Sequence, residues 1–194
     1  VMLIPVATFD SPGLALLYLV IFALGTIGGM AVYGLLAGFI VGRTADHSMR
    51  LALVTEYYYP HLGGVCEHVH HFARQARAAG HHVDIVTSYI PDSGAAPPNV
   101  IRLGRSVPWF INGSQSRITL GRELRRRMRR VLDDGAYDLV HVHSPLTPVL
   151  PMLAVEEASV PVIGTFHTYF DRSLGYRWFQ ARFQALLDRL AAAI

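Results

Sequence analysis

The sequence has no lysine and only one cysteine among its 194 residues. Because lysine is missing, every mechanism that forms a Schiff base on a lysine amine is excluded. The single cysteine, Cys66, excludes an internal disulfide framework and fits a protein that works in a reducing compartment. All 17 basic side chains are therefore arginines, and the formal net charge is +3.

Charge is also missing near the start of the chain, where residues 11–42 include no charged side chain. The apolar run 14–41 exceeds the about 20 residues that a helix needs to cross a hydrocarbon core. The run is not preceded by a basic segment or followed by a small-residue cleavage site, which argues against a cleaved signal peptide. We therefore predict a transmembrane helix and a linker in residues 1–48.

Arg43 lies directly after this run. By the positive-inside tendency, it places the rest of the chain on the cytoplasmic side of the inner, cytoplasmic membrane. We predict that residues 49–194 form one domain there, since about 100–150 residues is a common domain size.

This domain opens with a β-loop-α-β unit. An apolar run at 51–55 has the length of a buried strand, and the loop after it contains the pair Gly63–Gly64. Residues 65–79 then place apolar side chains on one helical stripe, and 83–87 follow as a second strand. Such a unit opens α/β domains of the nucleotide-binding type.

Strands and helices keep alternating further along the chain. The predicted strands are 100–103, 138–143 and 160–166, and the predicted helices are 118–134, 145–159 and 176–194, with a loop at 104–116. This alternation predicts the α/β class, with a Rossmann-like parallel sheet that has helices on both faces. Ligands of such sheets bind at the carboxyl ends of the strands.

Gly63 and Gly64 are the first candidate binding residues. Without Cβ atoms they let a phosphate group approach the backbone, and the helix after them presents free N–H groups and the positive end of its dipole. We predict that they bind a diphosphate, to which each such contact contributes about 0.3–1 kcal/mol. The alternative is a tight turn that only packs the helix against the strand.

Histidines gather at the predicted ends of two strands. His141 and His143 share one face of their strand, because side chains of a strand alternate, and His167 follows the next strand. We predict a site role for His167, with a metal site of these three histidines as the alternative. Three further histidines are predicted to lie on the surface of the helix 65–79: His68, His70 and His71.

Arginines crowd the predicted helix 118–134, and only Glu123 balances them. The six are Arg122, Arg125, Arg126, Arg127, Arg129 and Arg130. An ordinary solvated helix face is less one-sided. An anionic membrane contributes about 1 kcal/mol per well-placed arginine, and nucleic acid phosphates are the alternative. Because Trp109 and Phe110 precede the helix and no nucleic-acid reading motif accompanies the charge, we predict a membrane surface and no nucleic-acid partner.

Several short motifs resemble the N-terminal domain of family-4 glycosyltransferases of the GT-B fold. They are residues 55–64, Glu67-His68-Val69, Gly80-His81-His82-Val83, His141-Val142-His143 and Gly164-Thr165-Phe166-His167-Thr168. Within that family the sequence is most similar to the phosphatidyl-myo-inositol mannosyltransferases. The likeness covers residues 49–194 and only the first half of a typical enzyme of the family.

The resemblance assigns roles to individual residues. It implies that Gly63 and Gly64 meet the diphosphate of a nucleotide-sugar donor and that His167 is the catalytic residue, touching the transferred sugar or the acceptor. It also implies a set of acceptor-binding residues: Tyr57, His61, Asn112, Ser114, Arg117 and Arg172. The sequence departs from the mannosyltransferases at two of these, since Arg172 stands where they carry lysine and His61 near a position where they carry an acid.

The resemblance further implies a retaining transfer of a hexosyl group, and by the closer likeness a mannosyl group. The donor would be a nucleotide diphosphate sugar and the acceptor a membrane lipid or glycan, with no cofactor and no metal. The family's donor-side domain, which carries a basic pair and an acidic motif, is missing from this sequence, so we expect the chain alone to be inactive. The alternative is a non-catalytic membrane-bound α/β module that binds an anionic lipid or a partner protein.

Overall fold

The computed structural model describes most of the chain from residue 48 onward. The described residues are 48–91, 94–111, 114–167 and 178–194, together with 11, 13, 14, 16, 17, 20, 21 and 24, and only the backbone is described at 110, 111 and 114–116. The chain divides into two compact units, Val1–His47 and Ser48–Ile194. The predicted span at 14–41 lies mostly outside the described residues, and among those described no helix is long and apolar enough to cross a membrane.

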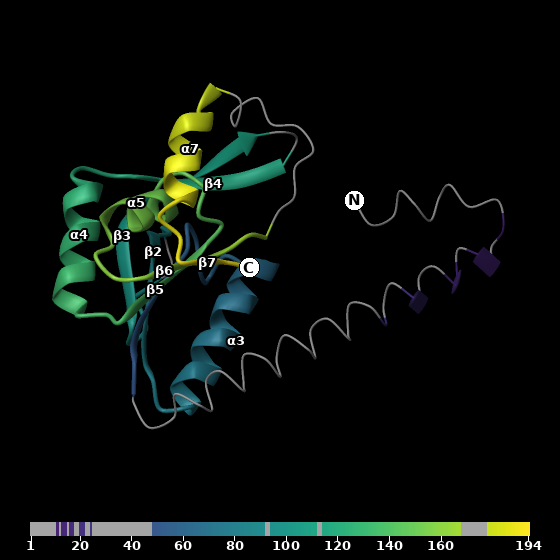
Figure 1. Cartoon of the computed structure of the whole chain (residues 1–194), viewed down its shortest axis with the longest axis horizontal. Helices are drawn as coiled ribbons and strands as arrows, with labels where there is room; N and C mark the ends of the chain where they lie inside the picture. The colour runs from purple at the N-terminus through teal and green to yellow at the C-terminus, as the bar shows by residue number, and fades with distance from the viewer. Residues whose placement is uncertain are drawn as a thin grey trace. The chain divides into compact units, whose positions relative to one another are not determined.

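The second unit is built on one seven-stranded sheet (Figure 1). Its strands are β1 (Arg50–Val54), β2 (His82–Tyr89), β3 (Val100–Ile111), β4 (Ser114–Leu120), β5 (Leu139–His143), β6 (Val162–Thr165) and β7 (Ala192–Ala193). The strand order is β4-β3-β2-β1-β5-β6-β7, and every neighbouring pair is parallel except β3 and β4. The sheet is therefore mixed, with one antiparallel edge strand, and not wholly parallel as predicted.

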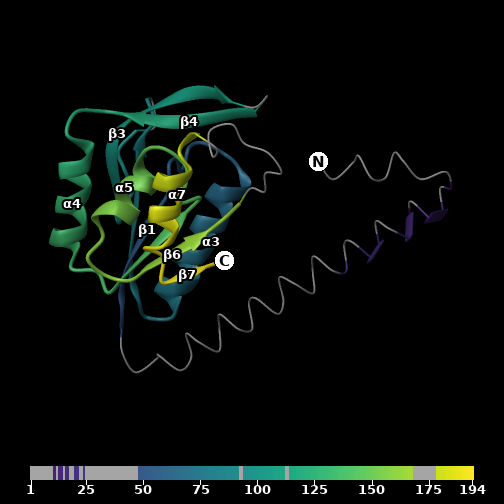
Figure 2. The same cartoon turned by 45° about the horizontal axis from the view of Figure 1, so that its top comes forward.

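Helices cover both faces of this sheet, as predicted. They are α3 (Gly64–Ala78), α4 (Leu124–Gly135), α5 (Leu150–Glu157) and α7 (Gln180–Leu187). α3 packs on one face, and α4, α5 and α7 pack on the other (Figures 1 and 2). Side chains of β1 point alternately to the two faces of the sheet. Leu51 and Leu53 join the apolar cluster under α3, while Ala52 and Val54 join the cluster on the opposite face. A strand buried on both faces has to be apolar throughout, which explains its uninterrupted apolar run.

The prediction was wrong between residues 104 and 123. The predicted loop and helix start are replaced by a hairpin of β3 and β4, paired from Arg105 with Leu120 to Ile111 with Ser114. The sequence signal for this hairpin is the pair Asn112-Gly113 between the strands, a dipeptide typical of two-residue connections. Leu120 suits the apolar stripe of a helix as well as the end of a strand, so periodicity alone favoured the earlier helix start.

The end of the chain also differs from the predicted helix 176–194. α7 covers only Gln180–Leu187, and β7 then adds a short parallel strand beside β6. The backbone N–H of Ile194 donates to the carbonyl of Gly164 at 2.8 Å, so the last residues satisfy their backbone groups through the sheet.

Glu56, directly after β1, is a buried carboxylate that joins three separate elements. The hydroxyl of Thr119, on β4, donates to its Oε1 at 2.6 Å. The backbone N–H groups of Val149 and Leu150, at the start of α5, both donate to its Oε2 at 2.9 Å. No described side chain of α5 caps that end of the helix itself. Glu56 therefore acts as the missing helix cap and fixes the hairpin at the same time.

Burial dominates the ionisation of this carboxyl group. Glu56 is only 3% exposed, and burial raises its pKa to about 7, although the hydrogen bonds from Thr119, Val149 and Leu150 work in the opposite direction. A carboxyl group with a raised folded-state pKa stabilises the fold most at low pH, and this contribution is lost as the pH rises from about 4.5 through about 7.

We predict that Glu56→Ala and Glu56→Gln have different effects on the free energy of unfolding. Alanine leaves three buried donors without an acceptor, so Glu56→Ala should destabilise the fold by about 2–4 kcal/mol at any pH. Glutamine can keep these hydrogen bonds but does not titrate. The wild type should therefore lose about 2–3 kcal/mol of unfolding free energy between about pH 4.5 and 8, and Glu56→Gln should not. Urea unfolding across that range tests both, and equal pH profiles for the wild type and Glu56→Gln would contradict the assignment.

Candidate functional site

The carboxyl ends of the central strands bring the predicted site residues to one edge of the sheet. β1, β5 and β6 are parallel neighbours, with Val54 beside Val142 and His143 beside Thr165. The loop that follows β1 leads into α3, and His167 lies two residues after β6. Parallel sheets bind their ligands at this edge.

Gly63 and Gly64 form the start of α3, as predicted. A Cβ atom added to either glycine would meet no described atom within 4 Å. The φ of Gly63 is 172°, an extended conformation that any residue adopts, so neither packing nor this backbone angle requires glycine there. The described atoms around Gly63 and Gly64 therefore give no packing reason for glycine and leave open space in front of the pair, and the diphosphate role stays a prediction.

The first turn of α3 can bind an anion. No described side chain caps the helix at Gly63, so the N–H groups of its first turn are not satisfied by a side chain. The positive end of the helix dipole points the same way. One acidic residue of this turn, Glu67, accepts a hydrogen bond from the hydroxyl of Tyr59 and lies 3.5 Å from His71.

Three of the predicted acceptor residues lie together beside this loop. The rings of Tyr57 and His61 meet edge to face, with centroids 4.7 Å apart. Burial lowers the pKa of His61, and the positive charge of Arg117, on β4, lowers it further. The guanidinium of Arg117 therefore lies near the loop that carries His61. Arg117 is oriented by a hydrogen bond of 2.7 Å from its Nε to the hydroxyl of Ser106. The hairpin and the β1–α3 loop thus form one polar wall.

The remaining predicted acceptor residues cannot be placed in the same detail. Ser114 opens β4 with only its backbone described, while Asn112 and Arg172 lie outside the described residues. Their roles stay predictions.

His167 belongs to a cluster of four imidazoles under the start of α3. Its Nε2 lies 3.0 Å from Nδ1 of His143. The ring of His68, on α3, lies 5.4 Å from that of His143 and 5.3 Å from that of His167. His141 completes the cluster, with its ring 4.4 Å from that of His143 and its Nε2 2.7 Å from the hydroxyl of Thr165. The prediction that His68 lies on the surface is therefore wrong.

These four imidazoles are held neutral. Burial lowers the pKa of each, to about 4 for His141 and about 2 for His143, and repulsion from the other imidazoles adds to the effect at all but His68. A neutral imidazole donates one hydrogen bond and accepts one, but it offers no positive charge to an anion. His167 can therefore act on a hydroxyl group by hydrogen bonding.

The metal alternative is not supported. Among the described residues no group of three or more His, Cys, Asp or Glu side chains is arranged to hold a metal ion. The Nε2 of His141 lies 2.7 Å from the hydroxyl of Thr165 and the Nδ1 of His143 lies 3.0 Å from His167, whereas the buried Nε2 atoms of His143 and His68 have no hydrogen-bond partner among the described residues.

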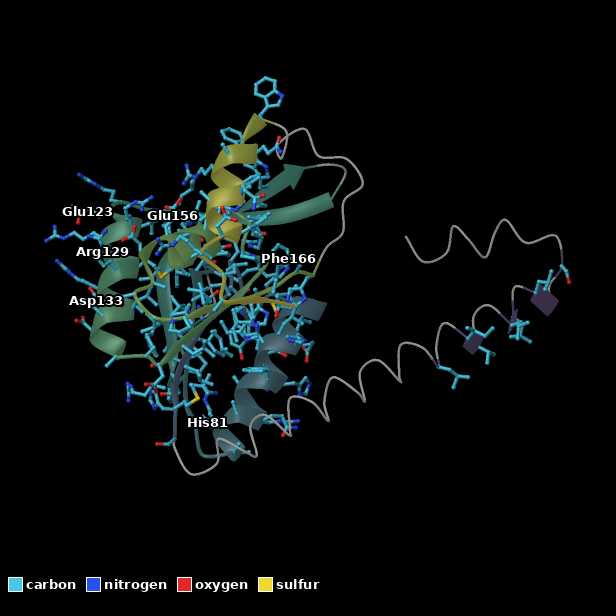
Figure 3. The ribbon with its side chains drawn as sticks, viewed as in Figure 1. His81, Glu123, Arg129, Asp133, Glu156 and Phe166 are labelled. Atoms are coloured by element: carbon cyan, nitrogen blue, oxygen red, sulfur yellow. The ribbon has the colours of Figure 1, made fainter. Side chains whose placement is uncertain are left out.

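The arginine-rich helix is less unbalanced than its own sequence indicates. All six predicted arginines are exposed, on α4 or just before it. Arg125 pairs with Glu156 and Glu157 of α5, and Arg129 pairs with Glu157. Figure 3 labels Arg129 on α4 and Glu156 on α5. Arg126 lies 3.6 Å from Glu123. The expectation that only Glu123 balances the arginines is therefore wrong, because α5 neutralises two of them across the helix interface.

Sequence reasoning missed two residues of this edge, Glu56 and His68. A carboxylate directly after the apolar run of β1 was a usable signal for Glu56, because Glu is almost never buried without partners. His68 lies four residues after Gly64, so the two share one side of the helix, and that side faces the strand ends.

Comparison with known proteins gives consistent matches. Residues 62–194 match the family model described as Glycosyltransferase Family 4. The chain is 33% identical over 146 residues to the phosphatidyl-myo-inositol mannosyltransferase of Mycolicibacterium smegmatis, covering 75% of this chain and 38% of that protein. It is 36% identical over 132 residues to the protein of the same name from Mycobacterium leprae, covering 68% and 35%. The chain thus spans less than two-fifths of the length of these relatives.

Two solved structures also resemble the chain. An alpha-glucosyltransferase in complex with UDP and a 13-mer DNA has a TM-score of 0.45 and 15% identity, covering 76% of this chain and 37% of that one. The catalytic domain of starch synthase IV from Arabidopsis thaliana, bound to ADP and acarbose, has a TM-score of 0.37 and 13% identity, covering 63% and 34%.

We predict that the buried imidazoles make the fold sensitive to acid. Their folded-state pKa values are lowered, so their stabilisation is complete above about pH 6.5 and is lost as the pH falls below it, by up to about 1.4 kcal/mol per pH unit for each proton. His143→Asn keeps a hydrogen-bonding group near Nδ1 but does not titrate, so it should reduce this slope by about 1 kcal/mol per pH unit.

Urea unfolding between about pH 6.5 and 5 measures that slope. Gln75→Asn, at an exposed position of α3 and without a titrating group, is the control and should leave the slope unchanged. An unchanged slope in His143→Asn would show that the imidazole of His143 is not held neutral by the fold.

Proposed function

Because the chain belongs to glycosyltransferase family 4, we propose that it is the acceptor-side part of an enzyme that transfers a hexosyl group from a nucleotide diphosphate sugar to a membrane acceptor. One observation carries this proposal. The open space in front of Gly63 and Gly64 lies at the start of α3, and one turn along that helix His68 contacts the ring of His167. A diphosphate on the glycines therefore brings its sugar toward a neutral imidazole.

The glycines hold the diphosphate through the backbone. The N–H groups and the dipole of α3 stabilise the charge that develops as the diphosphate departs, which is electrostatic work of the oxyanion-hole kind. Each such contact contributes about 0.3–1 kcal/mol. This is too little for catalysis alone, so further positive groups have to act on the same diphosphate. The resemblance to the family assigns them to its second, donor-side domain.

His167 orients the sugar or the acceptor by a hydrogen bond. Its Nε2 is engaged by His143, which fixes the plane of the ring. Burial lowers the pKa of His167, and its neutral imidazole offers one hydrogen-bonding nitrogen to a sugar or acceptor hydroxyl without adding a positive charge. Retention of configuration at the transferred carbon belongs to the proposal through the family resemblance.

The acceptor binds against the wall formed by Tyr57, His61 and Arg117. The guanidinium of Arg117 suits a phosphate, and aromatic rings suit the apolar face of a polyol ring. The relatives from Mycolicibacterium smegmatis and Mycobacterium leprae are named phosphatidyl-myo-inositol mannosyltransferases. We therefore propose a phosphoinositol-type lipid head group as the acceptor and mannose as the sugar.

A lipid acceptor requires the domain to work at a bilayer. The apolar run 14–41 is the proposed tether, and the exposed arginines of α4 are the proposed contact with anionic lipid on the cytoplasmic side. The contact between these arginines and anionic lipid should weaken as salt is added, because salt screens exposed charges and the Debye length is about 8 Å at physiological ionic strength.

Transfer of labelled mannose from its nucleotide diphosphate to phosphatidylinositol, measured with the whole protein as its gene encodes it, tests the proposal. Gly64→Leu places a side chain in the open space, where its Cβ meets no described atom within 4 Å. It should lower kcat/KM at least about 100-fold, which corresponds to about 2.7 kcal/mol.

Leu62→Ala is the matched control, since Leu62 is 75% exposed in the same loop, and it should keep wild-type activity. Full activity in Gly64→Leu would refute the diphosphate role of the glycines, and no transfer from any nucleotide sugar would refute the function.

A further inference from the structure

Two large apolar side chains stand exposed at the start of α7. Trp178 is 83% exposed and Phe179 is 57% exposed. The rest of the helix is firmly docked, because Leu186 is buried and Arg189 donates hydrogen bonds to the carbonyls of Val155 and Ala158. Trp178 and Phe179 directly precede this docked helix, and an exposed apolar pair of this kind marks a surface that meets a partner or a membrane.

An ionic bridge joins this end of α7 to the arginine-rich helix α4. Glu156, on α5, accepts a hydrogen bond of 2.8 Å from Arg182 of α7 and also pairs with Arg125 of α4. Arg182 lies in the first turn of α7, and Trp178 and Phe179 directly precede that turn. Figure 3 shows Glu156 between Glu123, at the start of α4, and α7.

The charges of α4 run against its own dipole. Its first two turns carry arginines and no acidic residue, whereas Asp133 and Asp134 lie in its last turn. A helix is stabilised by the opposite order. Figure 3 shows Glu123 and Asp133 at opposite ends of the helix, so the positive charge is gathered at the end that the ionic bridge connects to α7. A local rule broken in this way points to a functional surface.

We propose that the start of α7 and the arginine-rich end of α4 form one docking surface for an anionic bilayer, with Trp178 and Phe179 inserted at the headgroup–acyl boundary. Tryptophan prefers this boundary, because its ring is apolar and its N–H is polar. The arginines beside it meet lipid phosphates, so the two parts recognise one partner. The inference rests on the membrane role in the proposed function and adds an apolar anchor to it.

The two tryptophans of the chain, Trp109 and Trp178, allow a direct measurement. In the full chain with Trp109→Phe, Trp178 is the only indole. The probes are vesicles of phosphatidylcholine alone and vesicles in which about one third of the lipid is phosphatidylglycerol, each with and without bromine on the acyl chains. Bromine quenches an indole only at close range, so a chain that is merely tethered nearby is not quenched.

We expect the emission of Trp178 to shift to shorter wavelength and to be quenched by brominated lipid in the anionic vesicles but not in the neutral ones. Replacing Arg122, Arg126, Arg127 and Arg130 by glutamine should abolish this quenching. Phe179→Ser should reduce it, and Leu62→Ser, which changes another exposed apolar side chain, should leave it unchanged. Thermal unfolding confirms that each variant is folded.

Three outcomes would overturn the inference. If anionic vesicles bind the chain through these arginines while Trp178 stays unquenched, the membrane role in the proposed function stands and the anchor is wrong. If the chain binds no vesicle, both fail. If the emission of Trp178 is already shifted in buffer and the chain sediments as a dimer, the patch is covered by a second copy.

Discussion

A single buried carboxylate, that of Glu56, sets the geometry on which the candidate site depends. It receives hydrogen bonds from the hairpin through Thr119 and from the start of α5 through two backbone N–H groups. The backbone carbonyl of the same residue accepts a hydrogen bond from the hydroxyl of Ser88, on β2. The hairpin carries Arg117, and α5 follows the strand that carries His143, so one residue after β1 positions both sides of the edge.

The site combines two kinds of group that do different work. The start of α3 offers backbone N–H groups and open space, which suits an anion. The imidazoles beneath it are neutral and linked to one another, which suits hydroxyl groups. A diphosphate sugar has both, with charge at one end and hydroxyls at the other. In the proposed function, charge recognition and sugar recognition are separated by one helical turn.

Local periodicity predicted the parts of the fold that local forces determine. The unit of β1, α3 and β2 and the strands β5 and β6 agree with the sequence to within a few residues, because both faces of the sheet demand apolar strands. The hairpin was missed because the apolar residues at its end suit a helix as well as a strand. The sequence signal that could have identified it is the pair Asn112-Gly113.

The site itself was predicted only in part. Position after a strand was enough to place Gly64 and His167 at the edge of the sheet where the strands end, while their site roles stay predictions. Glu56, His68 and the ion pairs of Arg125 depend on partners 31 to 99 residues away in the chain, which no local pattern encodes.

The central claim is that Gly63, Gly64 and His167 face one ligand, and a titration followed by nuclear magnetic resonance tests it most directly. Isotope-labelled protein would be titrated with a nucleotide diphosphate hexose while the amide signals of both glycines and the imidazole signals of His167 are recorded. The account predicts that all three sets shift along one saturation curve, while the amides of Asp133 and Asp134 stay fixed. The account would be contradicted if the glycine amide signals shifted while the imidazole signals of His167 did not, or if the two sets of signals gave different apparent affinities.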